Sequence, residues 1–171
     1  MFSQDESRCG FLTVRRRRLT ARGIQPGGAL QPIFAWCYVY GAVAPATGEH
    51  FFLELPYLNA DMFQIFVEAF AQAFPDSLNL LRLDNSGAHT ASRIRWPDNV
   101  RAVWLPPSCP ALHPIERVWR DLKDDMAWLQ FANLEAQQDF VADLLRTYEA
   151  LTRQSLTGYA YLVEAINALC S

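Results

Sequence analysis

Apolar residues occur in the first third of the chain as short, nearly continuous runs. Two of these runs, residues 32–43 and 49–55, are rich in aromatic and β-branched side chains and flank the turn sequence Ala44–Gly48. Apolar runs joined by a short segment that contains Pro and Gly predict an antiparallel hairpin. We therefore expect two paired strands here.

The middle of the chain alternates between helical and strand patterns. Residues 59–74 place apolar side chains at helical spacing, with Asn59 as the candidate N-cap. Residues 78–83 are nearly all apolar, as in a parallel strand that is buried on both faces, and residues 100–105 predict a further strand. A short helix is expected between these two strands, around Thr90–Arg95.

The last part of the chain predicts three helices. From Ile115 to Met126 the apolar positions recur at intervals of three, one, three and four residues, which indicates a helix with one buried face. Pro114 suits the start of this helix, because its missing N–H is one that a helix leaves unused. Apolar faces after Asn133 and after the break at Thr157-Gly158 predict two more helices, which cover the sheet or mediate self-association.

The composition is that of one globular domain. A chain of 171 residues can bury a single core, and its hydrophobic fraction of 51% with 13% aromatic residues excludes a disordered chain. No apolar run approaches the roughly 18–20 residues of a membrane helix and no leader opens the chain, so we expect a cytoplasmic protein. The cysteines form no C-x-x-C pair, which argues against a zinc site or a disulfide framework and favours reduced thiols. They are Cys9, Cys37, Cys109 and Cys170.

The net charge of −3 is unlike that of a free-standing nucleic-acid binder, but the charge is unevenly distributed. Residues 1–30 carry six Arg against Asp5 and Glu6. Four of these Arg are consecutive, and such a run must lie in solvent. It is either a solvated loop or a patch that contacts phosphates, since Arg supplies paired donors to phosphate oxygens. These four residues are Arg15, Arg16, Arg17 and Arg18.

Two carboxylates occupy positions that suit divalent-metal binding. Asp84 follows the apolar run 78–83, where a buried strand opens into a loop, and Glu116 lies in the first turn of the helix after Pro114. Magnesium prefers hard oxygen ligands, so converging carboxylates together with substrate phosphate suffice to hold it. The alternative is structural, because Asp is common in turns and Glu is favoured in a first turn by the helix dipole.

A series of short motifs at ordered spacing favours the metal site. The motifs are Asp84-Asn85 with His89 behind them, Leu105-Pro106-Pro107, and the stretch Leu112–Trp119 followed by Leu122-Lys123. This series resembles the catalytic domain of the bacterial insertion-sequence branch of the mariner-like DDE transposases, within the RNase H/integrase superfamily. Two details depart from the family pattern. The 31 residues between Asp84 and Glu116 are slightly few, which implies a small loop deletion, and His113 stands where Asn is usual.

The resemblance implies metal-dependent phosphoryl transfer on DNA. The catalytic residues and metal ligands that it implies are Asp5, Asp84 and Glu116, with Asp5 taken from a DES motif on the first strand. Two Mg²⁺ or Mn²⁺ ions would bind there, one activating water or a 3′-hydroxyl and the other stabilising the leaving 3′-oxygen. Crowded carboxylates repel one another, so at least one pKa should rise without metal. A solvated chain end is the alternative interpretation of Asp5.

The implied fold is α/β, an RNase H-like mixed five-stranded sheet flanked by helices in the order β-β-β-α-β-α-β-α. One catalytic domain would span residues 1–171, with its core in about residues 1–130 and C-terminal helices in 131–171. Asp5 lies so near the start of the sequence that its strand is expected to be short. The ends of the first and fourth strands would lie side by side and bring Asp5 and Asp84 together.

Three further residues of the motifs are candidates for supporting roles, namely Asn85, His89 and His113. His89 either orients a ligand or a phosphate, or is structural. At the position of His113 an Asn would cap the helix. Neutral His reproduces this in part, whereas protonated His cannot accept a hydrogen bond. We therefore expect a neutral His113 and an activity that falls as the pH drops through the ordinary His value of about 6.5.

Candidate DNA contacts are the Arg15–Arg18 run together with Arg120 and Lys123 on the wetter side of the predicted helix. Trp119 is expected to be a core anchor, with base stacking as the alternative. The implied partners are DNA, as element ends and as target, and a second copy of the chain in a homodimer. A separate transposase chain with a helix-turn-helix is a further candidate partner, since no such module precedes the catalytic motifs. The chain is expected in the bacterial cytoplasm, at the nucleoid when it is bound to DNA.

Two functions of different classes stay open on the sequence. The first is an active transposase catalytic domain, which the intact set of three carboxylates favours. The second is a non-catalytic remnant that self-associates with, or titrates, a full-length transposase, which the missing helix-turn-helix and the short first strand favour. A plain RNase H-like nuclease is the third candidate.

Overall fold

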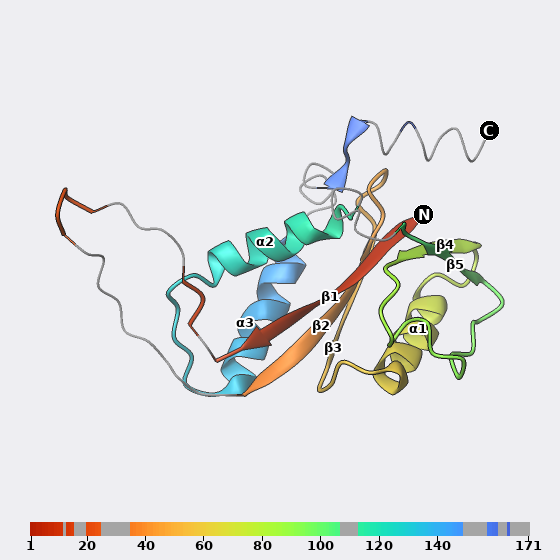
Figure 1. Cartoon of the computed structure of the whole chain (residues 1–171), viewed down its shortest axis with the longest axis horizontal. Coiled ribbons are helices and arrows are strands. Elements are labelled where there is room, and N and C mark those ends of the chain that lie inside the picture. The colour runs from red at the N-terminus through yellow and green to blue at the C-terminus, as the bar shows by residue number, and fades with distance from the viewer. Residues whose placement is uncertain are drawn as a thin grey trace.

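The computed structural model describes residues 1–11, 13–15, 20–24, 35–106, 113–148, 157–160 and 164. The strands are β1 (Phe2–Gly10), β2 (Trp36–Val43), β3 (His50–Leu55), β4 (Asn79–Leu83) and β5 (Val100–Trp104), and the helices are α1 (Ala60–Ala73), α2 (Ile115–Asp125) and α3 (Leu134–Thr147). The strands form one sheet in the order β3-β2-β1-β4-β5 (Figure 1). β1, β2 and β3 are antiparallel neighbours, whereas β1, β4 and β5 run parallel. The predicted mixed five-stranded sheet with flanking helices is confirmed.

The predicted hairpin is confirmed by β2 and β3, but β1 differs from its prediction. It does not end near Asp5 and continues to Gly10, so that it is nine residues long. Its second half, Ser7-Arg8-Cys9-Gly10, has no β-rich pattern. The antiparallel ladder that pairs residues 3–10 with β2 makes it a strand by satisfying its backbone groups. Asp5 therefore lies within a strand.

Helices cover both faces of the sheet (Figure 1). α1 packs on one face through a row of phenylalanines that includes the fully buried Phe66. α2 and α3 pack on the other face, where Leu122 and Val141 are fully buried. Successive side chains of a strand point to opposite faces, so the neighbours Val39 and Tyr40 of β2 belong to different cores.

Side-chain caps start two of the helices. The predicted N-cap Asn59 accepts a hydrogen bond from the N–H of Met62 at 2.9 Å, where α1 begins. Asn133 accepts from the N–H of Ala136 at 2.7 Å, where α3 begins. Each cap satisfies an N–H that the helix itself leaves open and contributes about 1 kcal/mol. Both of these predicted helices are confirmed.

The prediction of a short helix around Thr90–Arg95 is wrong, because no helix joins β4 to β5 among the described residues. The segment makes isolated turns, in which the N–H of Thr90 bonds to the carbonyl of Ser86 and the N–H of Ile94 to the carbonyl of Ala91. A helix this short overcomes the cost of nucleation only by burying an apolar face, and this segment has no apolar periodicity.

α2 confirms the helix predicted after Pro114, and Trp119 is buried as expected of a core anchor. Residues 107–112, which lead to this helix, lie outside the described residues. The helix predicted after Thr157-Gly158 also lies largely outside them.

Cys9 and Cys37 are buried and free. Cys109 and Cys170 lie outside the described residues. In the part of the chain that the structure describes, every helix is too short or too polar to cross a membrane.

Candidate active site

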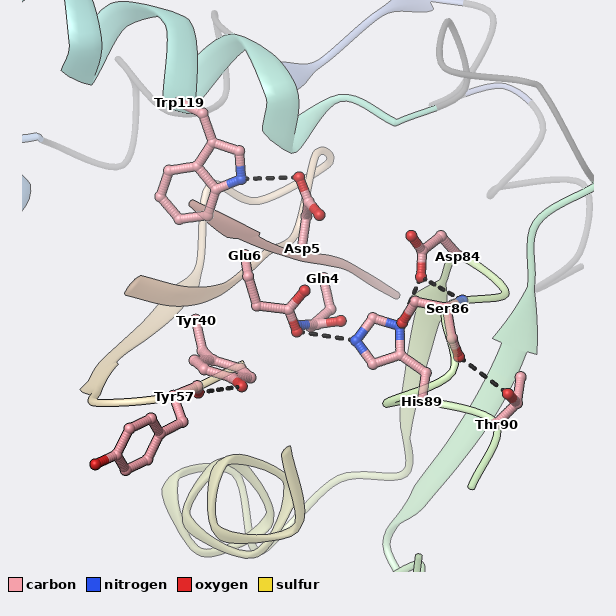
Figure 2. A network of polar contacts seen from close by, with 10 residues as sticks. All are labelled: Gln4, Asp5, Glu6, Tyr40, Tyr57, Asp84, Ser86, His89, Thr90 and Trp119. Carbon is pink, nitrogen blue, oxygen red and sulfur yellow. Dashed lines mark hydrogen bonds and ion pairs between the residues drawn. The ribbon is translucent and has the colours of Figure 1, made fainter. Parts of the chain in front are cut away.

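Parallel pairing of β1 with β4 brings two of the predicted carboxylates together. The register pairs Ser3 with Arg82. Continued by two residues, this register sets Asp5 beside Asp84, the first residue after β4. Both side chains line one cavity of about 460 Å³. Figure 2 shows the two carboxylates on the side of the sheet that faces α2.

Asp5 is half-buried, and its pKa is raised to about 7. Burial is the largest cause, the negative charge of Glu6 comes next, and the charge of Asp84 adds to both. The indole N–H of Trp119 donates to Oδ2 of Asp5 at 3.0 Å and acts in the opposite direction by favouring the charged form (Figure 2). The pKa rise expected for crowded carboxylates is therefore found, but its leading charged neighbour is Glu6 and not Glu116.

One oxygen of Asp84 is fixed by the protein. Oδ1 accepts from the N–H of Ser86 at 3.0 Å and lies 2.7 Å from Nδ1 of His89. Burial alone would raise the pKa of Asp84, but these hydrogen bonds and the charge of His89 lower it. The side chain is 49% exposed, so Oδ2 remains available to a ligand in the cavity.

His89 joins Asp84 to Glu6 (Figure 2). Its Nε2 lies 2.9 Å from Oε1 of Glu6, and its side chain is only 1% exposed. The ring also packs against Phe63 of α1, with ring centroids 4.4 Å apart. Burial would lower the pKa of His89, but the hydrogen bonds and charges of Glu6 and Asp84 outweigh it and raise the pKa. Both ring nitrogens of His89 thus face carboxylate oxygens, an arrangement that favours the protonated ring.

Glu6 is a part of the site that the sequence analysis missed. It follows Asp5 in β1 and so points to the opposite face of the sheet. Its side chain is 8% exposed, and Oε1 also accepts from Nε2 of Gln4 at 2.8 Å. The sequence did contain a sign of this role, because the DES motif carries Glu6 as a second carboxylate beside Asp5. Its partner His89, however, lies 83 residues further along the chain, in a loop.

Trp119 has a polar role in addition to its place in the core. Its ring packs against Phe52 and lies over Gly41, which is the β2 partner of Asp5. A Cβ atom at Gly41 would come within 2.6 Å of Cη2 of Trp119. The absence of a side chain at Gly41 therefore leaves the space through which the indole reaches Asp5.

Glu116 is exposed in the first turn of α2. Among the described residues no three His, Cys, Asp or Glu side chains lie close enough together to hold a metal ion, so Glu116 does not join Asp5 and Asp84 in one cluster. It does lie three residues before Trp119, and residues three apart are neighbours on a helix surface. Glu116 is thus about one helical turn from the contact between Trp119 and Asp5.

Asn85 holds the loop after Asp84 in place. Its Nδ2 donates to the carbonyl of Leu105 at 2.7 Å, and the N–H of Leu105 donates to the carbonyl of Leu83 at 2.8 Å. These two bonds tie the chain after β4 to the chain after β5, so the position of Asp84 depends on both strands.

His113 does not cap α2, and the capping prediction is wrong. The N-cap residue is Pro114, and the buried imidazole of His113 lies with Nδ1 at 2.9 Å from Oγ of Ser3. Burial, and after it the charge of Arg82, lowers the pKa of His113 to about 4. This lowered pKa favours the neutral ring that the sequence predicts. Any loss of activity on its protonation, however, moves from the ordinary value of about pH 6.5 to about pH 4.

The side chains predicted to contact DNA lie at the surface where the structure describes them. Arg15 and Arg120 are exposed, and Lys123 is half-buried on α2. The rest of the run, Arg16, Arg17 and Arg18, lies outside the described residues.

The donor set fits a hard divalent cation. Asp5 and Asp84 present carboxylate oxygens to one cavity, and Mg²⁺ and Mn²⁺ prefer such ligands. Oδ1 of Asp84 is already bonded to the protein, which leaves Oδ2 directed by the fold. Two candidate ligands thus share the cavity, and Glu116, the third candidate, does not cluster with them among the described residues.

Two sequence comparisons identify relatives. A sequence model of the DDE superfamily endonucleases matches residues 1–148. The uncharacterized protein y4pE/y4sA of Sinorhizobium fredii is 31% identical over 120 residues, which make up 70% of this chain and 87% of that protein.

The fold is similar to that of solved Mos1 transposase structures. The Mos1 strand transfer complex has a TM-score of 0.73 at 15% identity and covers 97% of this chain and 52% of the Mos1 chain. The paired-end complex with the left transposon end has a TM-score of 0.70 at 15% identity, over 97% of this chain and 53% of the other. The chain thus spans about half the length of these transposases. At this identity the likeness concerns the fold.

Proposed function

The chain belongs to the family of DDE superfamily endonucleases, and from this premise we propose that it cleaves and joins DNA strands by two-metal phosphoryl transfer during transposition. Its fold is that of a DDE transposase catalytic domain. The observation that carries the proposal is the pair Asp5 and Asp84, which share one cavity beside the parallel strands β1 and β4.

The proposed ligands of two Mg²⁺ or Mn²⁺ ions are Asp5, Asp84 and Glu116. Mos1 paired-end complexes with Mg and with Mn support this choice of metal. When bound, the ions supply Lewis-acid activation of the attacking oxygen and stabilisation of the leaving oxygen. Asp84 would bind through Oδ2 while His89 and the backbone hold its Oδ1. Glu116, exposed in the first turn of α2, would be the third ligand.

Other parts of the proposal concern partners and organisation. We propose DNA as the substrate, contacted at its phosphates by Arg120, Lys123 and the Arg15–Arg18 run; a Mos1 neighbour is a complex with a transposon end. A homodimer, a separate helix-turn-helix-bearing chain and a cytoplasmic location remain proposals, as does one catalytic domain with its core in about residues 1–130. Asn85, His89 and His113 would have supporting roles.

Nicking of a supercoiled plasmid in Mn²⁺ tests the metal site. Asp84→Asn should lower the rate by roughly two to three orders of magnitude, the usual loss when a group that stabilises transition-state charge is removed. Asp76→Asn, which changes an exposed acid before β4, is the matched control and should nick like the wild type. An Asp84→Asn protein that nicks normally would rule out this site.

The position of Glu116 favours a second candidate function. Because Glu116 does not cluster with Asp5 and Asp84 among the described residues, a non-catalytic remnant that associates with a full-length transposase is the alternative. Thermal melting with Mn²⁺ separates the two. A working site should raise the melting temperature of the wild type but not of the Asp5→Asn/Asp84→Asn double variant. A wild-type chain that neither nicks nor responds to Mn²⁺ would be the remnant.

A further inference from the structure

The loop of residues 84–89 carries one candidate metal ligand, Asp84, while the other, Asp5, lies on β1. The parallel ladder between β1 and β4 ends at the pair Ser3 and Arg82, before either carboxylate. Asn85 ties the loop to the chain after β5, on the side of β4 away from β1. The spacing between the two carboxylates is therefore left to contacts of side chains.

The hydrogen bonds of Asp84 within the loop do not attach it to β1. Its Oδ1 accepts from the N–H of Ser86 and lies 2.7 Å from Nδ1 of His89, and both of these residues belong to the same loop. Among the described residues, the one side-chain hydrogen bond between the loop and β1 joins Nε2 of His89 to Oε1 of Glu6, at 2.9 Å. Glu6 is the neighbour of Asp5 in the strand, so this contact links the two candidate ligands.

The link between the loop and β1 is buried. The side chains of His89 and Glu6 are 1% and 8% exposed, and the His89 ring packs against Phe63 with centroids 4.4 Å apart. Oε1 of Glu6 also accepts from Nε2 of Gln4 at 2.8 Å, which holds this oxygen in place. Buried polar groups whose hydrogen bonds are made hold one geometry, because the alternative is an unpaired group away from water.

We propose that Glu6 is the positioning residue of the candidate metal site and that, by holding His89, it sets the Asp84 carboxylate beside Asp5 (Figure 2). Glu6 lines the same cavity, but its Oε1 already contacts two nitrogens of the protein, so it acts through His89 and not as a ligand. Loss of a residue that orients a metal ligand typically costs about 10–100-fold in metal affinity. This inference rests on the proposed function and adds the residue that aligns its two sheet-borne ligands.

Hydrogen exchange of the Ser86 amide in EDTA tests the positioning without metal. In the wild type this N–H bonds to Oδ1 of Asp84 at 3.0 Å. Glu6→Ala should release His89 and with it the Asp84 carboxylate, so the amide should exchange about fivefold faster, the effect of losing one hydrogen bond. Glu6→Gln should keep the slow exchange, because its amide can either accept from or donate to the ring nitrogen. Unchanged exchange in Glu6→Ala would overturn the proposal.

Binding of Mn²⁺, followed by the electron paramagnetic resonance signal of the free ion, tests the consequence for the metal site. Glu6→Ala should bind Mn²⁺ at least about tenfold more weakly than the wild type, and Glu6→Gln should keep most of the affinity. Val67→Ala is the matched control, because it removes methyl groups from the fully buried core beneath α1 and should bind like the wild type. Loss of Mn²⁺ binding in Glu6→Gln with normal exchange at Ser86 would show that Glu6 is itself a ligand, and would overturn the proposal.

A double-mutant cycle tests whether the effect of Glu6 passes through the ring of His89. Once His89→Ala has removed the ring, adding Glu6→Ala should weaken Mn²⁺ binding no further, because the two side chains act on Asp84 as one unit. Losses that add independently would overturn the route through His89.

The two proposals fail separately. If the wild type neither binds Mn²⁺ nor nicks while Glu6→Ala still frees the Ser86 amide, the catalytic proposal is wrong and the positioning of Asp84 stands. If nicking depends on Asp84 while Glu6→Ala changes neither the exchange at Ser86 nor the Mn²⁺ affinity, the positioning role is wrong and the catalytic proposal stands. Far-UV circular dichroism confirms the fold of each variant. Glu6→Met, which keeps the volume without a strong acceptor, replaces Glu6→Ala if the latter is unstable.

Discussion

The candidate site has a sheet side, which carries Asp5 and Asp84, and a helix side, which carries Glu116 on α2. The two sides differ in how many interactions hold their carboxylates. On the sheet side, Asp84 bonds to His89, and His89 bonds in turn to Glu6, with heavy-atom distances of 2.7 and 2.9 Å. On the helix side, Glu116 is exposed. Among the described residues, one hydrogen bond, from Trp119 to Asp5 at 3.0 Å, joins α2 to these carboxylates.

The difference follows from how strands and helices are positioned. The parallel ladder between β1 and β4 fixes Ser3 against Arg82, and Asp5 and Asp84 follow two residues beyond this pair. A helix is positioned by side-chain packing, which permits scatter in its angle and distance from its neighbours. We therefore expect the sheet-borne carboxylates to be in place before metal arrives, and Glu116 on α2 to complete the site afterwards.

His89→Ala should have the largest effect on stability, because it removes the side chain that links Asp84 to Glu6 on the sheet side of the site. Glu6 would keep a buried charge with Gln4 as its remaining side-chain partner, and removing one member of a buried ion pair costs about 3 kcal/mol. The lost interaction between His89 and Asp84 adds little to this cost, because half of the Asp84 side chain is exposed and solvent screens its charge. Urea unfolding at pH 7 measures the effect. His50→Ala on the edge strand β3 is the control, and a His89→Ala loss no larger than that of the control would show that the bridge does not stabilise the fold.

Gly41→Ala should have the next largest effect, because it moves α2 away from the sheet. The added Cβ would meet the Trp119 ring at 2.6 Å, and overpacking of this kind costs about 2 kcal/mol. Two of the three nearest atoms, Cη2 and Cζ2 of Trp119, are absent from Phe, whereas the third, Cδ1 of Phe52 at 2.9 Å, remains. The double variant Gly41→Ala/Trp119→Phe should therefore lose less stability than the sum of the two single losses. Gly87→Ala is the matched control, since nothing lies within 4 Å of a Cβ there. Additive losses in the double variant would contradict this account of Gly41.

Local patterns predicted much of the fold and one half of the site. The hairpin, the Asn59 cap and the buried strand before Asp84 follow from short-range chemistry, and the motif order indicated that Asp5 and Asp84 would meet. The outer half of β1 could not be predicted in this way. Its residues Ser7-Arg8-Cys9-Gly10 have no strand preference of their own, and pairing with β2 decides their conformation.

The contacts between the residues of the site could not be predicted from the sequence, for a related reason. Glu6 and His89 are 83 residues apart, and Trp119 and Asp5 are 114 residues apart. Neither pair has a spacing or a period that a pattern could reveal. His113 shows the same limit, because its position before the helix suggested a cap, whereas packing turns its ring toward Ser3 in the interior.

Trp119→Phe should have a smaller effect, because it keeps the packing and removes the bond between α2 and Asp5. A hydrogen bond contributes about 1 kcal/mol, so the free energy of unfolding should fall by about that amount. The nicking rate should fall by more than this loss of stability explains, since α2 also carries Glu116. Trp104→Phe, an exposed Trp on β5, provides the control for both measurements. Normal nicking by Trp119→Phe would show that this bond does not position α2 for catalysis.

His113→Asn should have the smallest effect, and one that appears only in acid. The folded pKa of His113 is about 4, whereas an unfolded His titrates near 6.5, so between these values the unfolded chain binds the extra proton. Stability contributed by the neutral ring is therefore complete above about pH 6.5 and is lost as the pH falls toward 4, by on the order of 1 kcal/mol at pH 5.5. His113→Asn has no such group, so urea unfolding should show a smaller loss of stability from pH 7 to pH 5.5 than in the wild type. Identical pH dependence in the two proteins would mean that His113 is protonated in the folded state, and that its contact with Ser3 does not require the neutral ring.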